Sequence, residues 1–222
     1  MSDLLHIALW NIDLQGNEER TVSCWEWLDR QERDRAACFR FEDDRRRFLL
    51  RHAAYRQILG RAVNRSGREL QFASGHHGKP FLAGVVSSPR LEFSTSHSGD
   101  RALLAVATGG VIGVDIERLR PEIIDAALLE QTLTPEEIAA YENLQAEART
   151  RDFFRVWTRK ESVLKAAGVG LSVRPRDFSV AIAQGVLGLW SVFDLDVGPA
   201  YAATVAADRP DCVIEEHAWD WH

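Results

Sequence analysis

Residues 153–171 read FFRVWTRKESVLKAAGVGL, and this stretch decides the fold of the second half of the chain. Its apolar residues recur at the period of a helix, so we predict an amphipathic helix from Asp152 to Ala167 that stops at Gly168. Trp157, Glu161 and Lys165 fall on one stripe of that helix. A carboxylate and two lysines are costly to bury on a largely apolar helix, which points to a metal ion or an anion as their partner.

A second informative segment, GVIGVDIER, spans residues 110–118. β-Branched residues dominate it, so we predict a buried strand. Because side chains alternate along a strand, Asp115 and Glu117 point to the same side about 7 Å apart, and they repel each other unless a cation lies between them. Ligation by oxygen alone favours Mg²⁺ over Zn²⁺. The alternative is a solvated strand end at which Glu117 pairs with Arg118 or Arg120.

A third segment, FSTSHSG, covers residues 93–99 and is rich in hydroxyl groups. We predict a turn here between two strands. In such a turn Ser96 and His97 could hold phosphate oxygens through hydrogen bonds. The alternative is a turn whose hydroxyls satisfy only their own backbone.

Four motifs then follow one another in a fixed order. They are Gly78-Lys79-Pro80, Ser96-His97-Ser98, Gly113-Val114-Asp115-Ile116-Glu117, and Trp157-x-x-Lys160-Glu161-x-x-x-Lys165-x-x-Gly168-x-Gly170-Leu171. In this order and context the chain resembles the 4′-phosphopantetheinyl transferases, and more specifically their two-domain, surfactin-synthetase-activating type. The resemblance reaches upstream to the arginines that begin at Arg33, and it covers roughly residues 28–185.

The resemblance implies an α+β fold of two similar halves that pack as an intramolecular pseudo-dimer with the active site between them. We place the halves at residues 1–109, for the nucleotide contacts, and 110–222, for the metal site and the catalytic helix. Thr108-Gly109-Gly110 is the turn-forming sequence at this boundary.

The resemblance also implies the reaction. The phosphopantetheine arm of coenzyme A passes to a serine of an acyl, aryl or peptidyl carrier protein, and 3′,5′-ADP is released. Mg²⁺ between the pyrophosphate oxygens neutralises the charge that develops. The expected partners are coenzyme A as co-substrate and a transiently bound carrier protein.

Residue roles carry over motif by motif. Asp115, Glu117 and Glu161 are expected to hold the metal, and Glu161, Lys165 and Asp115 to carry the catalysis. Glu161 would either ligate the metal or take the serine proton, and Lys165 would stabilise charge near the pyrophosphate or orient Glu161. Trp157 is expected to wall the cleft. The residues expected to bind coenzyme A are Lys79, Pro80, Ser96, His97, Lys160, Arg33, Arg35 and Arg47.

Two other functions remain open at this point. A Mg²⁺-dependent phosphodiesterase could use the same carboxylates, and a carrier-binding scaffold without strong activity would keep the fold. The net charge of −6 argues against a nucleic-acid substrate, because phosphates would repel the chain. The full set of three carboxylates with Lys165 argues against an inactive scaffold.

Basic residues are nevertheless concentrated between residues 30 and 56, where arginine is used far more than lysine. The planar fork of arginine suits phosphate. Acidic residues interleave with this region, so most of these arginines are expected to form a salt-bridged surface helix, and only two or three to serve a ligand.

The chain has 222 residues, of which 45% are hydrophobic, and only three cysteines. Their odd number and their spacing argue against a disulfide framework and against a structural zinc site. We find no signal peptide and no apolar run long enough to span a membrane, and we expect a cytoplasmic monomer that binds neither membrane nor nucleic acid.

The remaining elements follow from local patterns. We predict strands over 5–14, 69–73, 91–94, 102–107, 111–116, 178–183, 187–193 and 202–207, and helices over 23–28, 32–38, 43–63 and 135–148. The 135–148 helix has a complete start signal, with Thr134 as N-cap, Pro135 in the first position and Glu137 in the third. The loop from Ser74 to Pro89 is expected to be irregular.

Overall fold

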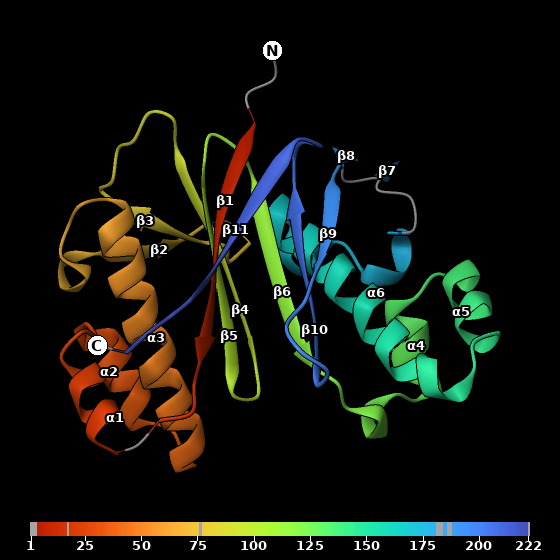
Figure 1. Ribbon diagram of the computed structural model, residues 1–222, viewed down its shortest axis with the longest axis horizontal. Helices are drawn as coiled ribbons and strands as arrows, with labels where there is room; N and C mark the ends of the chain where they lie inside the picture. The colour runs from red at the N-terminus through yellow and green to blue at the C-terminus, as the bar shows by residue number, and fades with distance from the viewer. Residues whose placement is uncertain (1–3, 17, 76, 181–183, 186–187, 222) are drawn as a thin grey trace.

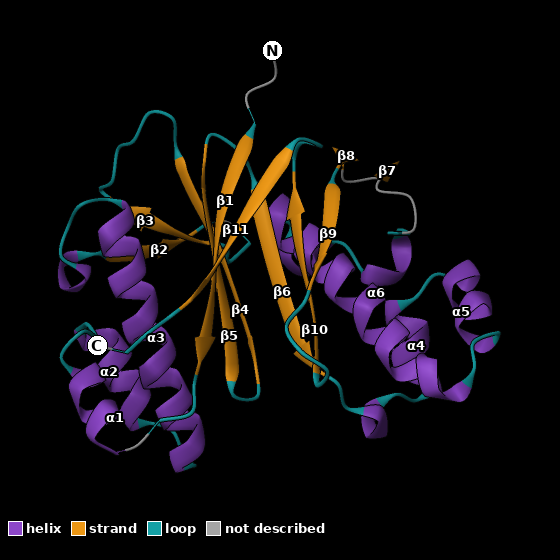
Figure 2. Ribbon diagram, in the orientation of Figure 1, coloured by secondary structure: helices purple, strands orange, loops and turns teal. Residues whose placement is uncertain are grey.

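The computed structural model describes residues 4–16, 18–75, 77–180, 184–185 and 188–221. Helices lie at the two outer ends of the molecule and the strands stand between them (Figures 1 and 2). The chain therefore has the α+β class and the arrangement in two halves that the sequence predicts.

The first half combines a helical layer with most of one sheet. Its elements are β1 (Leu5–Asp13), α1 (Glu18–Trp25), α2 (Arg30–Ala37), α3 (Glu42–Ala62), η1 (Gly67–Glu69), β2 (Gln71–Ser74), β3 (Pro80–Ala83), β4 (Leu91–Ser98) and β5 (Arg101–Thr108). The four-stranded sheet has the order β11-β1-β5-β4, and β2 pairs with β3 in a hairpin. Apolar residues of α3, such as Phe48 and Leu50, pack with Ile12 and Leu104 of the sheet.

The second half holds the long predicted helix against a smaller sheet. Its elements are β6 (Ile112–Arg118), η2 (Pro121–Ile123), α4 (Ala126–Thr132), α5 (Pro135–Glu142), α6 (Ala146–Ala167), η3 (Gly170–Ser172), η4 (Pro175–Asp177), β7 (Gln184–Gly185), β8 (Gly188–Leu189), β9 (Ser191–Leu195), β10 (Tyr201–Ala207) and β11 (Cys212–Ala218). The three-stranded sheet has the order β6-β10-β9, and α6 packs on it.

A shared apolar core joins the two halves. Ile7 of β1 and Leu103 of β5 pack in one buried cluster with Val114 of β6 and Val205 of β10. Burial of these side chains stabilises the contact between the sheets by the hydrophobic effect. The two halves thus share one interior at this contact.

The last strand crosses from the second half to the first. β11 pairs in parallel with β1, from Leu5 opposite Cys212 to Asn11 opposite Ala218. The tail continues along the first half, where Trp219 is buried and its backbone N–H donates to the Asn11 carbonyl. The division of the chain after residue 109 stays a prediction. The pairing of β11 with β1 links the two parts.

Several element boundaries differ from the predicted ones. The helix that begins at Pro135 ends at Glu142, and α6 already begins at Ala146. The segment 178–180 is not a strand, and 181–183 lies outside the described residues. Pro80–Ala83 is a short strand in the predicted loop. The start signal at Thr134 is confirmed, since Thr134 and Glu137 form a complete capping box.

The predicted turn at residues 93–99 is mostly strand. β4 runs on to Ser98, and only the next two residues turn into β5. Pairing with β5 continues through His97 opposite Ala102. The serines at 94, 96 and 98 therefore lie on one face of a strand, where they meet the second half.

Candidate functional site

Helix α6 carries the candidate site because one of its faces enters the core and another faces the first half. Phe153, Phe154 and Leu164 are buried, whereas Glu161 and Lys165 are partly exposed on the same helix. The helix ends at Gly168, whose φ of 64° is the left-handed conformation that the sequence predicts there.

Gly113 sets the distance between β6 and α6. A Cβ atom at this position would lie 2.0 Å from the Ser162 carbonyl oxygen and 2.4 Å from the Ala166 nitrogen. The helix therefore touches the strand backbone directly, which only glycine permits. This close packing brings the Asp115 side chain of β6 within reach of Lys165 on α6.

The serine face of β4 joins the two halves through hydrogen bonds. The Val114 N–H donates to Ser94 Oγ at 3.0 Å, and Ser96 Oγ donates to Asp115 Oδ1 at 2.7 Å. Ser98 Oγ donates to Glu117 Oε2 at 2.8 Å. Ser96 and Ser98 therefore orient the carboxylates of β6. The Ser96 hydroxyl was expected to contact phosphate, but here it donates to Asp115.

Asp115 lies at the centre of the site, and only one of its oxygens is satisfied. Lys165 Nζ donates to Oδ1 at 2.6 Å, beside the bond from Ser96. Oδ2 is buried and has no hydrogen-bond partner. A buried carboxylate oxygen without a partner is costly, so this oxygen points to a missing ligand.

Two further carboxylates, those of Glu117 and Glu161, lie near Asp115, and its negative charge disfavours their ionisation. Burial and then the charge of Asp115 raise the pKa of Glu117, and the same causes in the same order raise the pKa of Glu161. Lys165 and the other neighbouring donors only partly offset these effects. Two carboxylates whose charge a third carboxylate disfavours are a fitting environment for a cation.

The fit to a metal ion rests on this donor set. Within the described ranges, no group of three His, Cys, Asp or Glu side chains is arranged to enclose a metal by itself. Mg²⁺ does not need such a cage, because it commonly binds one or two carboxylates and completes its shell with water and substrate phosphates. The unpartnered oxygen of Asp115 and its acidic neighbours suit that mode.

A cleft of about 330 Å³ opens beside these carboxylates. It is lined from the first half by Lys79, Pro80 and Thr95, and from the second half by Glu161 and Lys165. Lys79 Nζ donates to the carbonyls of Ile112 and Ala166, so it fastens the β2–β3 hairpin to the second half. Burial lowers the pKa of Lys79.

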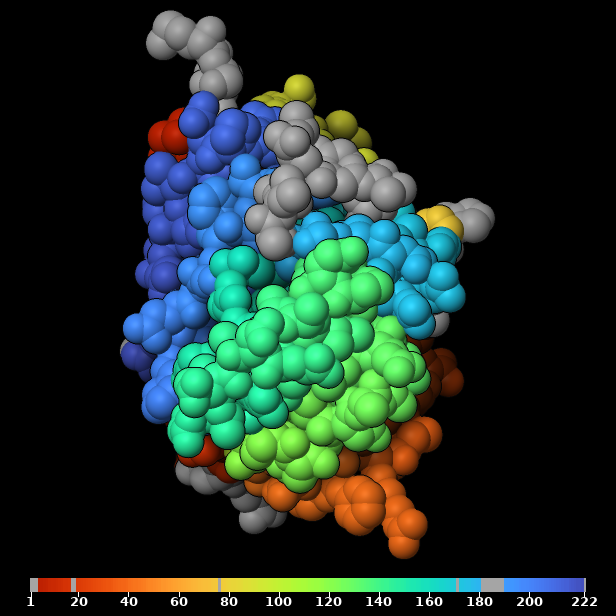
Figure 3. Space-filling view, turned by 90° about the vertical axis from the view of Figure 1, so that its right-hand side faces the viewer, coloured from red at the N-terminus to blue at the C-terminus, as the bar shows by residue number. Residues whose placement is uncertain are grey.

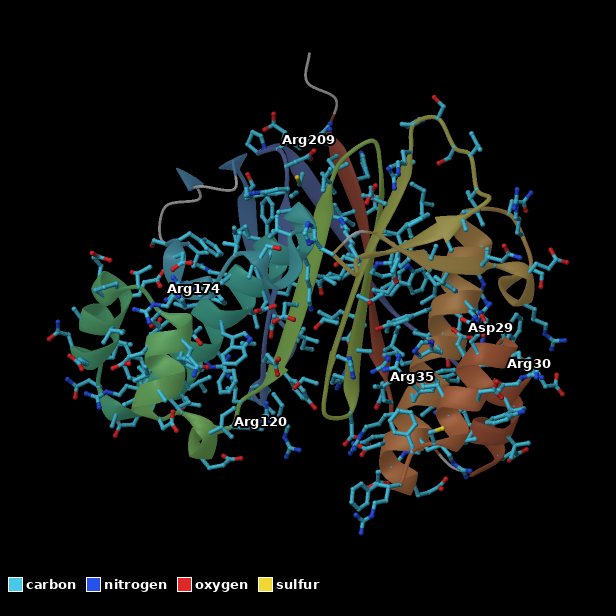
Figure 4. All side chains as sticks on the ribbon, turned by 180° about the vertical axis from the view of Figure 1, so that it is seen from behind. Asp29, Arg30, Arg35, Arg120, Arg174 and Arg209 are labelled. Atoms are coloured by element: carbon cyan, nitrogen blue, oxygen red, sulfur yellow. The ribbon has the colours of Figure 1, made fainter. Side chains whose placement is uncertain are left out.

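Positive charge crowds a second cavity, of about 240 Å³, between α3 and the end of β4. Arg51 and His97 line it. Loss of solvent around the ring and then the charge of Arg51 hold the pKa of His97 well below its ordinary value, although the residue stays accessible. Arg35, on the side of α2 that faces the sheets in Figure 4, contributes to the same shift. We call this space the basic cavity: Arg47 and Arg51 line it beside Asp44, and a concentration of cations of this kind favours an anion.

The structure brings only part of the predicted site together. Asp115, Glu117, Glu161 and Lys165 meet as expected, and Lys79 and Pro80 line the same cleft. Arg33 instead donates to the carbonyls of Trp25 and Glu26. Arg47 lines the basic cavity, but its guanidinium is paired with Asp100 and Asp44.

Lys160 is the predicted phosphate ligand whose position agrees least with that role. Its side chain is 0% exposed, and its Nζ lies 2.5 Å from Glu137 Oε2. It also donates to two backbone carbonyls, those of Pro175 and Phe178.

The sequence analysis did not name Arg51 as a ligand-binding residue. Arg51 lies one helical turn after Arg47 in α3, and this spacing could have identified it.

Comparison with known proteins yields consistent matches. Residues 111–206 match the model of the 4′-phosphopantetheinyl transferase superfamily, and residues 15–109 match that of the 4′-phosphopantetheinyl transferase N-terminal region. The transferase HetI of Nostoc is 35% identical over 172 residues, 78% of this chain and 72% of HetI. The transferase Sfp of Bacillus subtilis is 26% identical over 206 residues, 89% of this chain and 88% of Sfp. A Synechocystis relative, slr0495, is 35% identical over 147 residues, which cover 65% of this chain and only 58% of that protein.

Proposed function

This chain belongs to the 4′-phosphopantetheinyl transferase superfamily, and we propose that it transfers the 4′-phosphopantetheine moiety of coenzyme A to a serine of a carrier protein. The serine oxygen forms a bond to the β-phosphorus, the bond from that phosphorus to the bridging oxygen breaks, and 3′,5′-ADP leaves. The observation that carries this proposal is the unpartnered oxygen of Asp115, which lies between acidic and basic groups at the cleft.

Mg²⁺ is part of the proposal. Asp115 and Glu117 would hold it, with Glu161 either as a third ligand or as the acceptor of the serine proton, and when bound it would neutralise charge on the pyrophosphate. Lys165 lies where it can contact phosphate oxygens and hold Asp115 in place. Because α6 is a rigid helix packed on β6, these groups are positioned before the substrate arrives, and such preorganised charge stabilises a transition state.

Glu161 is the proposed acceptor of the serine proton. Burial and then the charge of Asp115 raise its pKa, which makes the carboxylate a stronger base than a solvated glutamate. Its side chain lines both the main cleft and a smaller neighbouring cavity, so it lies at the boundary between two binding spaces. An attacking hydroxyl could reach it from that second space.

The basic cavity is the proposed site of the 3′-phosphate. Arg51 and Arg35 would contact the phosphate with His97, and Arg47 would contribute from the rim. Arginine is suited to this because its fork forms charge-assisted hydrogen bonds with phosphate oxygens. An anion here relieves the mutual repulsion of the cations.

We also propose a cytoplasmic setting for this enzyme. Cys24, Cys38 and Cys212 are free thiols, which suits the reducing cytoplasm. No helix in the described part of the chain is long and apolar enough to cross a membrane. We expect a monomer that meets fatty-acid, polyketide or peptide carriers transiently. A scaffold or a phosphodiesterase is not favoured by the comparisons.

Incubation of the protein with an apo carrier protein, coenzyme A and Mg²⁺ tests the proposed function. We expect the carrier to gain the mass of one phosphopantetheine group and 3′,5′-ADP to appear in equal amount. A carrier with its serine replaced by alanine is the control. Hydrolysis of coenzyme A without any change in carrier mass would instead indicate a phosphodiesterase.

The basic cavity can be tested by calorimetry with coenzyme A and dephospho-coenzyme A. We expect the wild-type protein to bind coenzyme A more tightly by roughly 1.5–3 kcal/mol, the value of one charge-assisted hydrogen bond. Arg51→Gln should abolish most of this preference, because it removes a cation that lines the cavity.

Arg30→Gln is the control for this measurement, since the Arg30 side chain is 95% exposed and lies away from the cavity (Figure 4). It should leave the preference for coenzyme A unchanged. Equal affinity of the wild-type protein for the two ligands would show that Arg47 and Arg51 take no part in binding the 3′-phosphate.

A further inference from the structure

The buried lysine of the α6 motif has all of its donors occupied. An ammonium group has three N–H donors. Lys160 Nζ donates to the carbonyls of Pro175 and Phe178, each at 2.9 Å, and lies 2.5 Å from Glu137 Oε2. These acceptors use the three donors, and no N–H remains for a phosphate. The role of Lys160 therefore lies in the groups that it binds, which are Glu137 and the backbone of residues 175 and 178.

Glu137 is the second member of the pair and is equally occupied. Its Oε2 accepts the Thr134 N–H at 3.0 Å, which completes the capping box of α5. Its Oε1 accepts Ser179 Oγ at 3.1 Å and the Val180 N–H at 3.2 Å. The side chain is only 9% exposed. Glu137 and Lys160 thus bind the segment 175–180 from its two ends.

This segment forms a wall of the site. Pro175 lines the main cleft together with Glu161, and the same two residues line the smaller cavity of about 160 Å³ with Trp157 and Leu128. In Figure 3 the segment lies at the surface beside α4 and α5, and the contacts confirm that η4 packs against α4. Phe178 and Val180 also anchor the end of the segment, because they are buried in one apolar cluster with Val163 and Leu164 of α6, whereas Pro175 is not part of that cluster.

We propose that the Lys160–Glu137 pair is a positioning device for the transfer reaction: it holds the Pro175 wall against α6 and so shapes the binding spaces on both sides of Glu161. This inference rests on the proposed function. Lys160 and Glu161 are consecutive, so their side chains leave the helix about 100° apart. Anchoring Lys160 on one side therefore fixes the rotation at which α6 presents Glu161 to the cleft.

A role of the Lys160–Glu137 pair in positioning can be distinguished from a role in folding stability alone. Loss of one partner of a buried ion pair leaves an uncompensated charge and is destabilising, whereas neutral replacement of both partners is often tolerated. A neutral replacement does not restore the two bonds to the Pro175 and Phe178 carbonyls. Stability and positioning are thus expected to respond differently to the double substitution.

The test compares Lys160→Met, Glu137→Gln and the double variant. Gln keeps an oxygen for the Thr134 N–H, so the cap of α5 is retained. We expect Lys160→Met to lower the melting temperature clearly and the double variant to recover much of that loss. The KM for coenzyme A should stay raised by about 10-fold in the double variant, because a wall displaced by about an ångström weakens binding.

Arg174→Met is the matched control in the same segment. Arg174 pairs with Asp177 at 3.0 Å, but the pair is exposed and lies at the molecular surface (Figure 4). Its KM should stay within about twofold of the wild-type value. A double variant with wild-type KM would overturn the proposal, and so would a Lys160→Met variant that loses only kcat.

Hydrogen exchange gives a readout that does not depend on transfer. The amide N–H of Val180 donates to Glu137. This amide should exchange faster in Glu137→Gln than in the wild-type protein. The amides of α3 are the internal control, and their protection should not change. Unchanged exchange at Val180 would contradict the positioning role. Failure of the wild-type protein to modify any carrier would instead refute the proposed function and leave this exchange result valid.

Discussion

Asp115→Asn is expected to reduce transfer by about 10²–10³-fold while leaving the protein folded, since loss of a central charge-stabilising group typically costs this much. Asn keeps the size of the side chain and can still accept from Ser96. It removes the charge that faces Lys165, and it removes the unpartnered oxygen that suits a cation. The rate is measured with saturating coenzyme A and Mg²⁺, beside a thermal melt of each protein.

Stability should change in the opposite direction to activity. Asp115 raises the pKa of both Glu117 and Glu161 through like-charge repulsion, so its neutralisation lowers both pKa values toward the ordinary range. A raised pKa in the folded state costs stability at pH values above the ordinary glutamate pKa, so relief of this repulsion stabilises the fold in that range. We therefore expect an unchanged or higher melting temperature, as is typical when a charged active site is neutralised.

Asp194→Asn is the control for the loss of a paired carboxylate. Asp194 pairs with Arg159 through two bonds, at 2.7 and 2.6 Å, away from the cleft. It should transfer at close to the wild-type rate. An Asp115→Asn protein that transfers within a few-fold of wild type would show that the centre of the site lies elsewhere.

The meeting of β6 and α6 could be predicted because each element has a clear local period. Alternation puts Asp115 and Glu117 on one side of a strand, and the helical period puts Glu161 and Lys165 on one stripe. The structure confirms both elements and brings the carboxylates together. The resemblance to the transferase family supplied the remaining step, that the strand and the helix face each other.

The role of Lys160 could not be predicted from the same pattern. Sequence spacing treats Lys160 and Glu161 as neighbours on one helix, and it does not say which of them faces the interior. The decision depends on Glu137, which lies on another helix, and on two carbonyls in an irregular segment. Such tertiary partners have no local signal.

The arginines of α3 illustrate the same limit. The sequence predicts that most are salt-bridged, and Arg45 and Arg46 do pair with acidic residues one turn away. Arg56 is instead fully buried, where it pairs with Asp29 and Glu32. Charges of alternating sign predict a salt-bridged helix. They do not predict which arginine contacts a ligand, because that depends on how the helix packs against the rest of the protein.

The path of β11 also required the structure. Its segment has only general strand character, and its partner β1 lies at the other end of the chain. Pairing over such a separation depends on the register of the whole sheet. The same holds for the serines of β4, whose bonds to β6 turn a predicted hydroxyl-rich loop into a seam between the halves.

Gly113→Ala is expected to lower the free energy of unfolding by about 3 kcal/mol or more, because overpacking a contact of this kind forces backbone to move. The new Cβ would meet the Ser162 carbonyl at 2.0 Å and the Ala166 nitrogen at 2.4 Å, and neither is a flexible side-chain end. α6 must withdraw from β6, which separates Lys165 from Asp115 and lowers transfer as well. Urea unfolding measures the loss, with Gly75→Ala as control, since its nearest new contact is an ordinary 3.5 Å. A Gly113→Ala protein within 1 kcal/mol of wild type would mean that close helix–strand contact is not what holds the carboxylates together.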